Sequence, residues 1–287
     1  MPKILILVLI AYLLKRLGLF KEEDAKVFTN YVIYVALPVV AFKSSHSLGI
    51  TKETVSIVLL AWLSISSCLA LSYLLGKIFK LDSPTLRTFL LISSFGNTAF
   101  LGYPYTFHLF GEEGLSYAVI YDSLGSFIMV STVGFLIARG SVDAKRILTF
   151  PPFLGLLLGF LLKDYPIDFL REFLDGVSLS LSPVILFALG LSLSFSGIRK
   201  YLKLSIFALV IKMGFSALIT YLVAKALKLQ GLALYVSVLE SSMPSMVFAG
   251  ILALRYGLNH ELAFASVGLG IILSLIIFPL IVGFYPL

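Results

Sequence analysis

Two short stretches, each in the middle of a long apolar segment, decide the fold of this chain. Residues 94–104 read SFGNTAFLGYP, and residues 240–245 read ESSMPS. Glycine weakens a helix and proline removes a backbone donor, so each stretch predicts a break in a helix. Broken backbone at membrane depth is tolerated only inside protein or beside a water-filled cavity. The two breaks therefore predict a binding site within a membrane.

The composition agrees with a lipid environment. The chain has 287 residues, of which 59% are hydrophobic and 13% charged, and its mean hydropathy is +1.04. A helix that crosses the hydrocarbon needs about 20 apolar residues. The sequence predicts an all-α polytopic membrane protein with ten transmembrane helices, at residues 3–18, 25–44, 54–79, 86–109, 114–138, 148–163, 169–195, 202–226, 231–255 and 261–285.

Lysine and arginine predict the orientation of these segments. The loops near 15–26, 77–87, 139–146, 199–203 and 255 carry twice as many Lys and Arg as the loops on the other side. Because positive loops stay in the cytoplasm, both termini are predicted to lie outside. We expect a multi-pass protein of the inner (cytoplasmic) membrane. The net charge of +7 indicates topology and lipid contact, not nucleic-acid binding.

The chain also repeats itself. Pro38 is echoed by Pro183, residues 73–81 by 221–229, and Phe110-Gly111 by Tyr256-Gly257, at offsets of 145 to 148 residues. Each half holds an odd number of predicted segments, so the halves enter the membrane from opposite sides, as in many secondary transporters. The predicted organisation is a first inverted repeat at 1–138, a short cytoplasmic linker at 139–147 and a second repeat at 148–287.

Three charged residues fall near the middle of predicted spans: Asp122, Lys212 and Glu240. Each costs about 2.5–3.5 kcal/mol at a helix centre on insertion scales, so each is a candidate for function. We interpret Asp122 and Glu240 as ligands of a coupling proton or sodium ion. Asn97, Thr98 and Ser126 are candidates to add oxygens to a cation shell. Lys212 either snorkels or acts as the charge partner of an acid.

The broken helices supply the candidate substrate site. The N-terminal end of a half-helix suits a carboxylate, and the C-terminal end suits a cation. The predicted substrate-binding residues flank the two breaks and are Asn97, Thr98, Gly102, Pro104, Met243, Pro244 and Ser245. The single cysteine, Cys68, lies in an apolar run, and no Cys/His cluster predicts a metal site. We expect no cofactor other than Na⁺ or H⁺, which would act as a coupling ion.

Four stretches resemble the auxin efflux carrier family, which includes bacterial malate and malonate permease-like members. They are 36–38 with Phe42, 96–104, 188–193 and 243–258. The resemblance implies a ten-helix fold related to bile-acid symporters and sodium/proton antiporters, with crossed broken helices 4 and 9. It implies a scaffold domain of segments 1, 2, 6 and 7, a transport domain of segments 3–5 and 8–10, and an elevator motion.

The same resemblance implies an organic anion as substrate and a homodimer formed through the scaffold. It matches Asn97, Pro104 and Pro244 to the crossover positions of the family. Two features depart from family patterns. Residues 246–248 read MVF where many members have a polar residue, and the short linker is typical of a bacterial or archaeal carrier.

Three other classes of protein compete with a secondary transporter. An intramembrane aspartyl protease would need a Gly-x-Gly-Asp motif to complement Tyr121-Asp122, but Gly268-Leu269-Gly270 is followed by Ile271. We therefore do not expect an enzyme. An ion channel or a non-transporting membrane sensor on the same fold remains the alternative to a carrier of a small organic anion.

Overall fold

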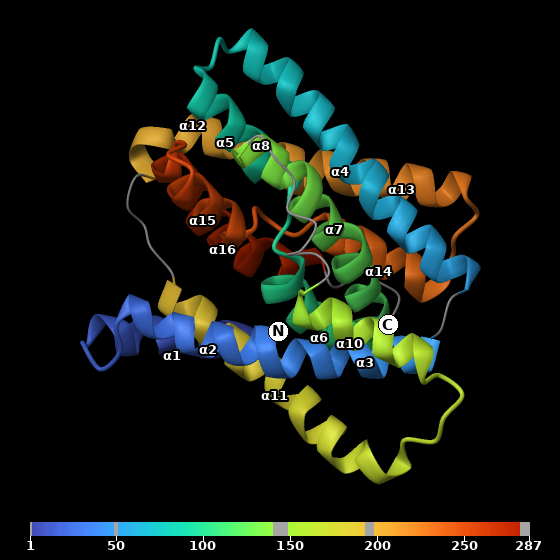
Figure 1. The fold of residues 1–287 in the computed structure, drawn as a ribbon. Coiled ribbons are helices and arrows are strands. Elements are labelled where there is room, and N and C mark those ends of the chain that lie inside the picture. Colours follow the sequence, from blue (N-terminus) through green and yellow to red (C-terminus); the bar gives the residue numbers. More distant parts are fainter. Residues whose placement is uncertain (1, 49–50, 140–148, 193–197, 282–287) are drawn as a thin grey trace.

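A computed structural model describes residues 2–48, 51–139, 149–192 and 198–281 (Figure 1). Every regular element in these ranges is a helix, and the one bridge between extended residues joins Gly96 to Ser245. Six helical runs are long and apolar enough to cross a membrane, namely Ala25–Ser47, Lys52–Ile78, Thr98–Arg139, Asp168–Ser192, Ile198–Ala226 and His260–Phe278. The structure therefore confirms an all-α multi-pass protein, while the ten-helix repeat stays a prediction.

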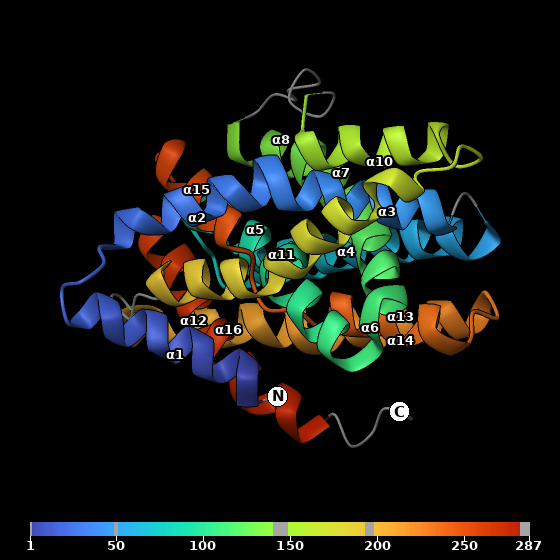
Figure 2. The same ribbon diagram turned by 90° about the horizontal axis from the view of Figure 1, so that it is seen from below.

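The helices form two layers (Figure 1), and Figure 2 views them from the side of the lower layer. The lower layer of Figure 1 contains α1 (Pro2–Arg16), α2 (Ala25–Tyr31), η2 (Val32–Ala36), α3 (Leu37–Leu48), α10 (Pro151–Leu161) and α11 (Arg171–Ser192). Glycines let these helices approach closely. A Cβ on Gly155 would meet the Pro38 backbone, and one on Gly190 would meet the Val8 carbonyl. Small residues at helix contacts are typical of membrane helices.

The upper layer contains the remaining helices. They are α4 (Lys52–Ile78), α5 (Ser83–Ser94), η3 (Thr98–Gly102), α6 (Tyr103–Ile120), η4 (Tyr121–Ser126), α7 (Phe127–Met129), η5 (Val130–Gly134), α8 (Phe135–Arg139), α12 (Ile198–Leu209), η7 (Val210–Phe215), α13 (Ser216–Ala226), α14 (Gly231–Ser241), α15 (Val247–Arg255) and α16 (His260–Ile281). Short 3-10 turns, η1 (Glu22–Asp24) and η6 (Asp168–Leu170), precede α2 and α11.

Local sequence explains where several helices begin. Thr51 caps α4, because its side chain accepts a hydrogen bond from the Thr54 N–H at 3.2 Å. Proline occupies the first turn of α5 and of α10, where its missing N–H costs nothing. Residues 140–147 of the predicted linker (139–147) and residues 282–285 of the last predicted segment lie outside the described residues.

The two halves share unusual backbone conformations at matching places. Lys80 and Lys228 both have positive φ, at 53° and 58°, and both lie at the ends of the echoed stretches 73–81 and 221–229. Positive φ is uncommon for residues other than glycine. Gly111 and Gly257, which belong to the third echo, both have φ of 65°. Gly111 is the point where the helical run Thr98–Arg139 turns.

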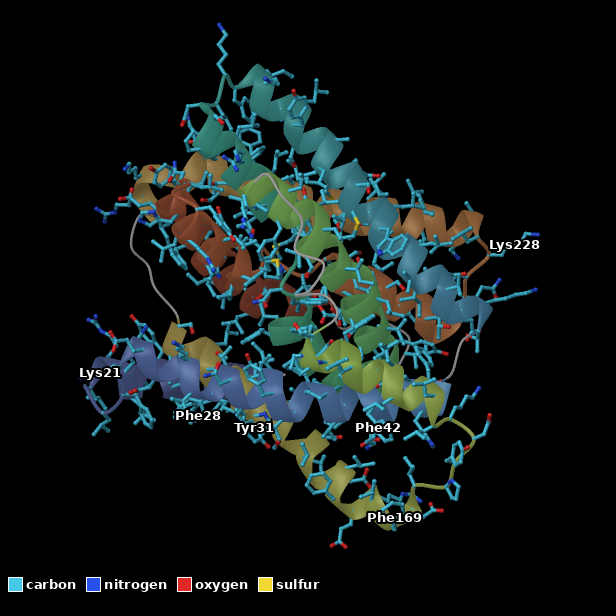
Figure 3. All side chains as sticks on the ribbon, in the orientation of Figure 1. Lys21, Phe28, Tyr31, Phe42, Phe169 and Lys228 are labelled. Carbon is cyan, nitrogen blue, oxygen red and sulfur yellow. The ribbon has the colours of Figure 1, made fainter. Side chains whose placement is uncertain are left out.

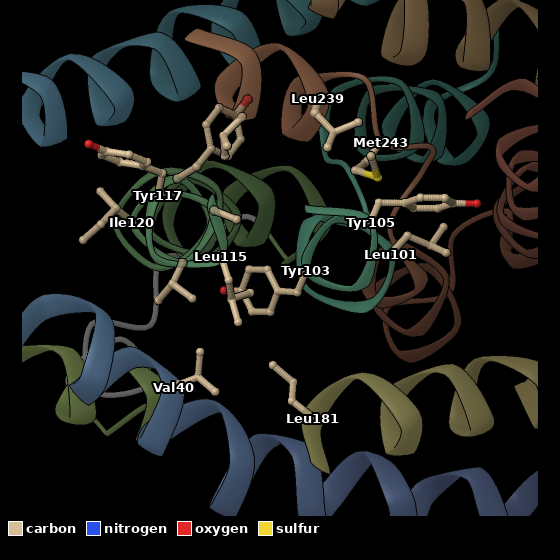
Figure 4. Close-up of a cluster of buried hydrophobic side chains, with 14 of the residues drawn as sticks. Val40, Leu101, Tyr103, Tyr105, Leu115, Tyr117, Ile120, Leu181, Leu239 and Met243 are labelled. Carbon is tan, nitrogen blue, oxygen red and sulfur yellow. The ribbon is translucent and has the colours of Figure 1, made fainter. Parts of the chain in front are cut away.

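The two layers contact each other through the helix that follows the first break. In Figure 4 Tyr103 of α6 lies on the side of its helix that faces the lower layer, above Val40 of α3 and Leu181 of α11. Leu101 and Tyr105 lie on the other side of this helix, near Met243. Lys21 and Lys228 lie at opposite ends of the molecule (Figure 3).

Candidate functional site

The two helix breaks pair with each other. Helix α5 ends at Ser94 and α14 ends at Ser241, and a short non-helical stretch leads from each end to the next helix. The Asn97 N–H donates to the Pro244 carbonyl at 2.7 Å, and the Met246 N–H donates to the Phe95 carbonyl at 3.0 Å. These two bonds enclose the antiparallel bridge between Gly96 and Ser245. Each break therefore satisfies backbone groups that the other leaves unpaired.

Asn97 stands at the start of η3. Its carbonyl accepts the N–H groups of Leu101 and Gly102 at 3.1 and 3.2 Å. Its side chain is 3% exposed, and the amide Nδ2 has no hydrogen-bond partner. A buried donor without a partner is costly, so this amide is a candidate to bind a ligand.

Asp122 is held by two hydroxyl groups of the helix after the break. Thr98 Oγ1 donates to one carboxyl oxygen, and the Tyr103 hydroxyl donates to the other at 2.9 Å. Asp122 lies in η4, and Ser126 follows one turn later in the same element. The predicted cation ligands Thr98, Asp122 and Ser126 are therefore neighbours in the folded chain.

Glu240 reaches the same helix from the other repeat. Its Oε1 accepts a hydrogen bond from Thr106 Oγ1 at 2.8 Å, and its Oε2 has no partner. The side chain is fully buried. Gly102 makes room for the carboxyl group, because a Cβ there would meet all three carboxyl atoms. The two acids thus contact one short helical stretch, residues 98–106.

Lys212 lies in η7 and is 2% exposed. The described ion pairs join Lys43 to Glu112, Lys43 to Asp175 and Lys200 to Glu261, so none of them includes Lys212. Its ammonium instead donates to the Ser241 carbonyl at 2.5 Å and to Ser216 Oγ at 3.4 Å. The partner of this lysine is the C-terminal end of α14, where we had expected an acid or the membrane surface.

A cavity of about 520 Å³ separates the paired breaks from the lower layer. Its volume is in the range of small-molecule sites. From the upper layer it is lined by the predicted residues Asn97, Thr98, Asp122 and Ser126. Four phenylalanines add apolar walls, namely Phe100, Phe127, Phe150 and Phe248. The last of these belongs to the apolar stretch 246–248 that departs from the family pattern.

The opposite wall of the cavity was not predicted. Lys26, Thr29 and Asn30 of α2 line it, together with Ser192 at the end of α11. Residues 26, 29, 30 and 33 fall on one face of a helix, so the available signal was a polar stripe within an otherwise apolar segment.

The other predicted substrate residues lie elsewhere. Glu240 and the predicted residues Gly102, Pro104, Met243, Pro244 and Ser245 are buried, and none of them lines this cavity. Pro244 and Ser245 pair with the first break, and Ser245 Oγ donates to the Ile92 carbonyl at 2.6 Å. These two residues therefore stabilise the backbone of the crossover and do not line the cavity.

Sequence comparisons identify the group of proteins to which this arrangement belongs. The family described as Membrane transport protein matches residues 1–146 and 139–282. The chain belongs to this family. The resemblance to auxin efflux carriers is thereby confirmed, and the molecule is a membrane transporter.

Two archaeal relatives extend over nearly the whole transporter. One, from Methanocaldococcus jannaschii, is named an uncharacterized transporter and is 35% identical over 96% of this chain and 95% of its own length. The other, from Methanothermobacter thermautotrophicus, carries the same description and is 33% identical over 96% of this chain and 94% of its own. Both relatives are named as transporters, which is consistent with the expectation that this chain is not an enzyme.

The contact between Gly102 and Glu240 generates a test. We expect Gly102→Ala to lower the melting temperature by several degrees, because overpacking a full site costs about 1–3 kcal/mol. Glu240→Ala removes the obstructing group. In the double variant the two losses should therefore be less than additive, as measured by thermal unfolding of purified protein. Strict additivity would contradict the contact. Gly176→Ala, which meets nothing within 4 Å, is the control.

Proposed function

We propose that this transporter is a secondary carrier of a small organic carboxylate that works by an elevator motion. The observation that supports this most is the cavity between the two layers. One wall is the polar end of a broken helix, and the other is a stripe of polar residues on α2. Alternating access requires a site between two bodies that can move against each other. A cavity between two layers of helices suits this requirement.

The cavity offers two groups suited to a carboxylate. The Asn97 amide has a free donor, and it stands at the N-terminal end of the helical run Thr98–Arg139, where the helix dipole is positive. Lys26 is the basic residue among those that line the cavity. We propose that the carboxylate binds between Asn97 and Lys26, with Thr98 nearby and the phenylalanines around the carbon skeleton.

We further propose that the chain is a ten-helix 5+5 inverted repeat. The matched positive φ at Lys80 and Lys228, and at Gly111 and Gly257, supports this division. The lower layer would be the scaffold domain, and the upper layer the transport domain. Exposed leucines on the lower layer, such as Leu13, Leu158 and Leu161, suit lipid or the interface of a homodimer through the scaffold.

An ion pair supports the elevator proposal. Lys43 of α3 binds Glu112 of α6 at 3.0 Å and Asp175 of α11 at 2.7 Å. It lies 17 residues after Lys26, or about 25 Å along the helix. An ion pair thus joins the two layers at one end, and a cavity separates them at the other. If the end that carries Lys26 is cytoplasmic, as the loop charges predict, this conformation faces inward and both termini lie outside.

Coupling is proposed to involve the two acids. Asp122 lines the cavity, whereas Glu240 is sealed behind Gly102. A proton or sodium ion that binds at Asp122 would offset the charge of the anion, and Ser126 lies beside it. In this proposal Asp122 exchanges the coupling ion with solvent in the present conformation, and Glu240 lies behind it.

Substitution of Asn97 tests the substrate site. Asn97→Ala should abolish carboxylate binding while the protein still folds, because the backbone pairing of the crossover does not use the side chain. Binding is measured as the rise in melting temperature with a panel of carboxylates. Counterflow in liposomes then reports transport. Gln230→Ala removes an exposed amide and should leave both unchanged. Wild-type uptake by Asn97→Ala would refute the assignment.

Lys26 provides a second test. Lys26→Ala should raise KM for the carboxylate about 10- to 100-fold, since a hydrogen bond to a charged group contributes about 1.5–3 kcal/mol. Lys21→Ala removes an exposed lysine at the same end of the molecule and is the matched control. Equal KM values in the two variants would exclude Lys26 from the site.

The coupling proposal predicts a difference between the two acids. Asp122→Asn should remove the dependence of uptake on pH or on sodium, because Asp122 faces the cavity. Glu240→Gln should alter this dependence less and lower stability more. Initial rates of uptake over a range of pH, with and without sodium, make the measurement. Unchanged dependence in both variants would eliminate coupling through these residues.

A further inference from the structure

Lys212 is a buried cation whose function is not explained by the cavity. It sits in the middle of the helical run Ile198–Ala226 and does not line the cavity. An intramembrane lysine is costly, so it needs partners that compensate for lost water. Among the described residues, no acid forms an ion pair with Lys212.

The partners of this ammonium are neutral oxygens. Ser241, whose carbonyl accepts at 2.5 Å, is the last residue of α14. The carbonyl end of a helix carries partial negative charge, which favours a cation. Ser216 Oγ lies 3.4 Å away and is itself 2.8 Å from Ser64 Oγ. The ammonium therefore binds a helix C-terminus and one hydroxyl group, and a second hydroxyl, that of Ser64, bonds to the first.

The ammonium also lies beside Gly96, where the two breaks pair. A Cβ on Gly96 would lie 2.7 Å from Lys212 Cε, 3.0 Å from Nζ and 3.2 Å from the Met243 carbonyl oxygen. Gly96 belongs to the first break, and Ser241 and Met243 bound the second. The lysine thus lies where the two breaks come together, and any residue larger than glycine at position 96 would displace it.

This combination of groups is what an alkali cation uses in a broken-helix transporter. Hard cations prefer carbonyl and hydroxyl oxygens, and the C-terminal ends of half-helices coordinate Na⁺. An ammonium on a side chain presents the same charge to the same oxygens and is already part of the protein. We propose that Lys212 is a built-in cation of the crossover that replaces sodium, so that this transporter binds and moves its substrate without a sodium requirement.

The inference rests on the proposed function of the crossover as the transport site. That proposal leaves a proton or a sodium ion as the coupling ion. A transporter without a sodium requirement would use a proton, bound at Asp122 or Glu240. The test below measures stability in the absence of substrate. A failure to find a carboxylate substrate would therefore refute the proposed function and leave this result standing.

The experiment compares melting temperatures of the purified full chain in NaCl and in N-methyl-D-glucamine chloride at equal ionic strength. The wild type should melt at the same temperature in both. Lys212→Ser removes the charge and leaves space beside the Ser241 carbonyl, so it should melt lower and recover several degrees as sodium is raised. Lys212→Met fills the space without a charge and should melt lower with no recovery. Lys225→Ser, at an exposed site on α13, is the control.

Two results would overturn the proposal. One is specific stabilisation of the wild type by sodium. The other is an equal response of Lys212→Ser and Lys212→Met to sodium. If Lys212→Ser does not fold, counterflow by the wild type in liposomes decides the question. Equal rates in sodium and in N-methyl-D-glucamine support the built-in cation, and a rate that requires sodium refutes it.

Discussion

The structure depends on the hydrogen bonds between two interrupted helices. In lipid an unsatisfied backbone group costs several kcal/mol, so a helix cannot simply stop at the midplane. Here the N–H of Asn97 and the N–H of Met246 each find a carbonyl on the other break. Because each break supplies the partners of the other, neither is stable alone. This pairing holds four half-helix ends in one place.

Charged side chains are arranged around this pairing according to the polarity of the helix ends. Lys212 binds the carbonyl end of α14, where a positive charge is favoured. The Asn97 amide and the hydroxyl of Thr98 stand at the amino end of the opposite half-helix. Asp122 and Glu240 bind hydroxyl groups along residues 98–106. The crossover therefore carries an internal cation and two acids, and none of the ion pairs among the described residues joins them.

The cavity is completed by a second layer of helices that does not take part in the crossover. Lys26, Thr29 and Asn30 belong to α2, and they face Asn97 and Asp122 across the cavity. The same continuous helix carries Lys43, which binds Glu112 of the upper layer at its other end. One helix thus contributes both a wall of the cavity and the contact that closes the layers away from it. Movement of the upper layer would change both together.

The amino-acid sequence by itself determined the membrane environment, the helical class, the positions of the two breaks and the family. These follow from local signals, because apolar runs, glycine and proline act on the backbone at or near their own positions. It also singled out Asn97, Thr98, Asp122, Ser126, Glu240 and Lys212 by their polarity within apolar segments.

Only the tertiary structure decided what these residues face. Asp122 lines the cavity while Glu240 is enclosed, although in the sequence both are acids within long apolar segments. Lys212 binds a carbonyl and not an acid, and α2 supplies half of the cavity. Each outcome depends on which helix faces meet between separate elements, from 29 residues apart for Lys212 and Ser241 to 134 apart for Thr106 and Glu240. Periodicity within one segment carries no information about the partner of that segment, and packing alone settles it.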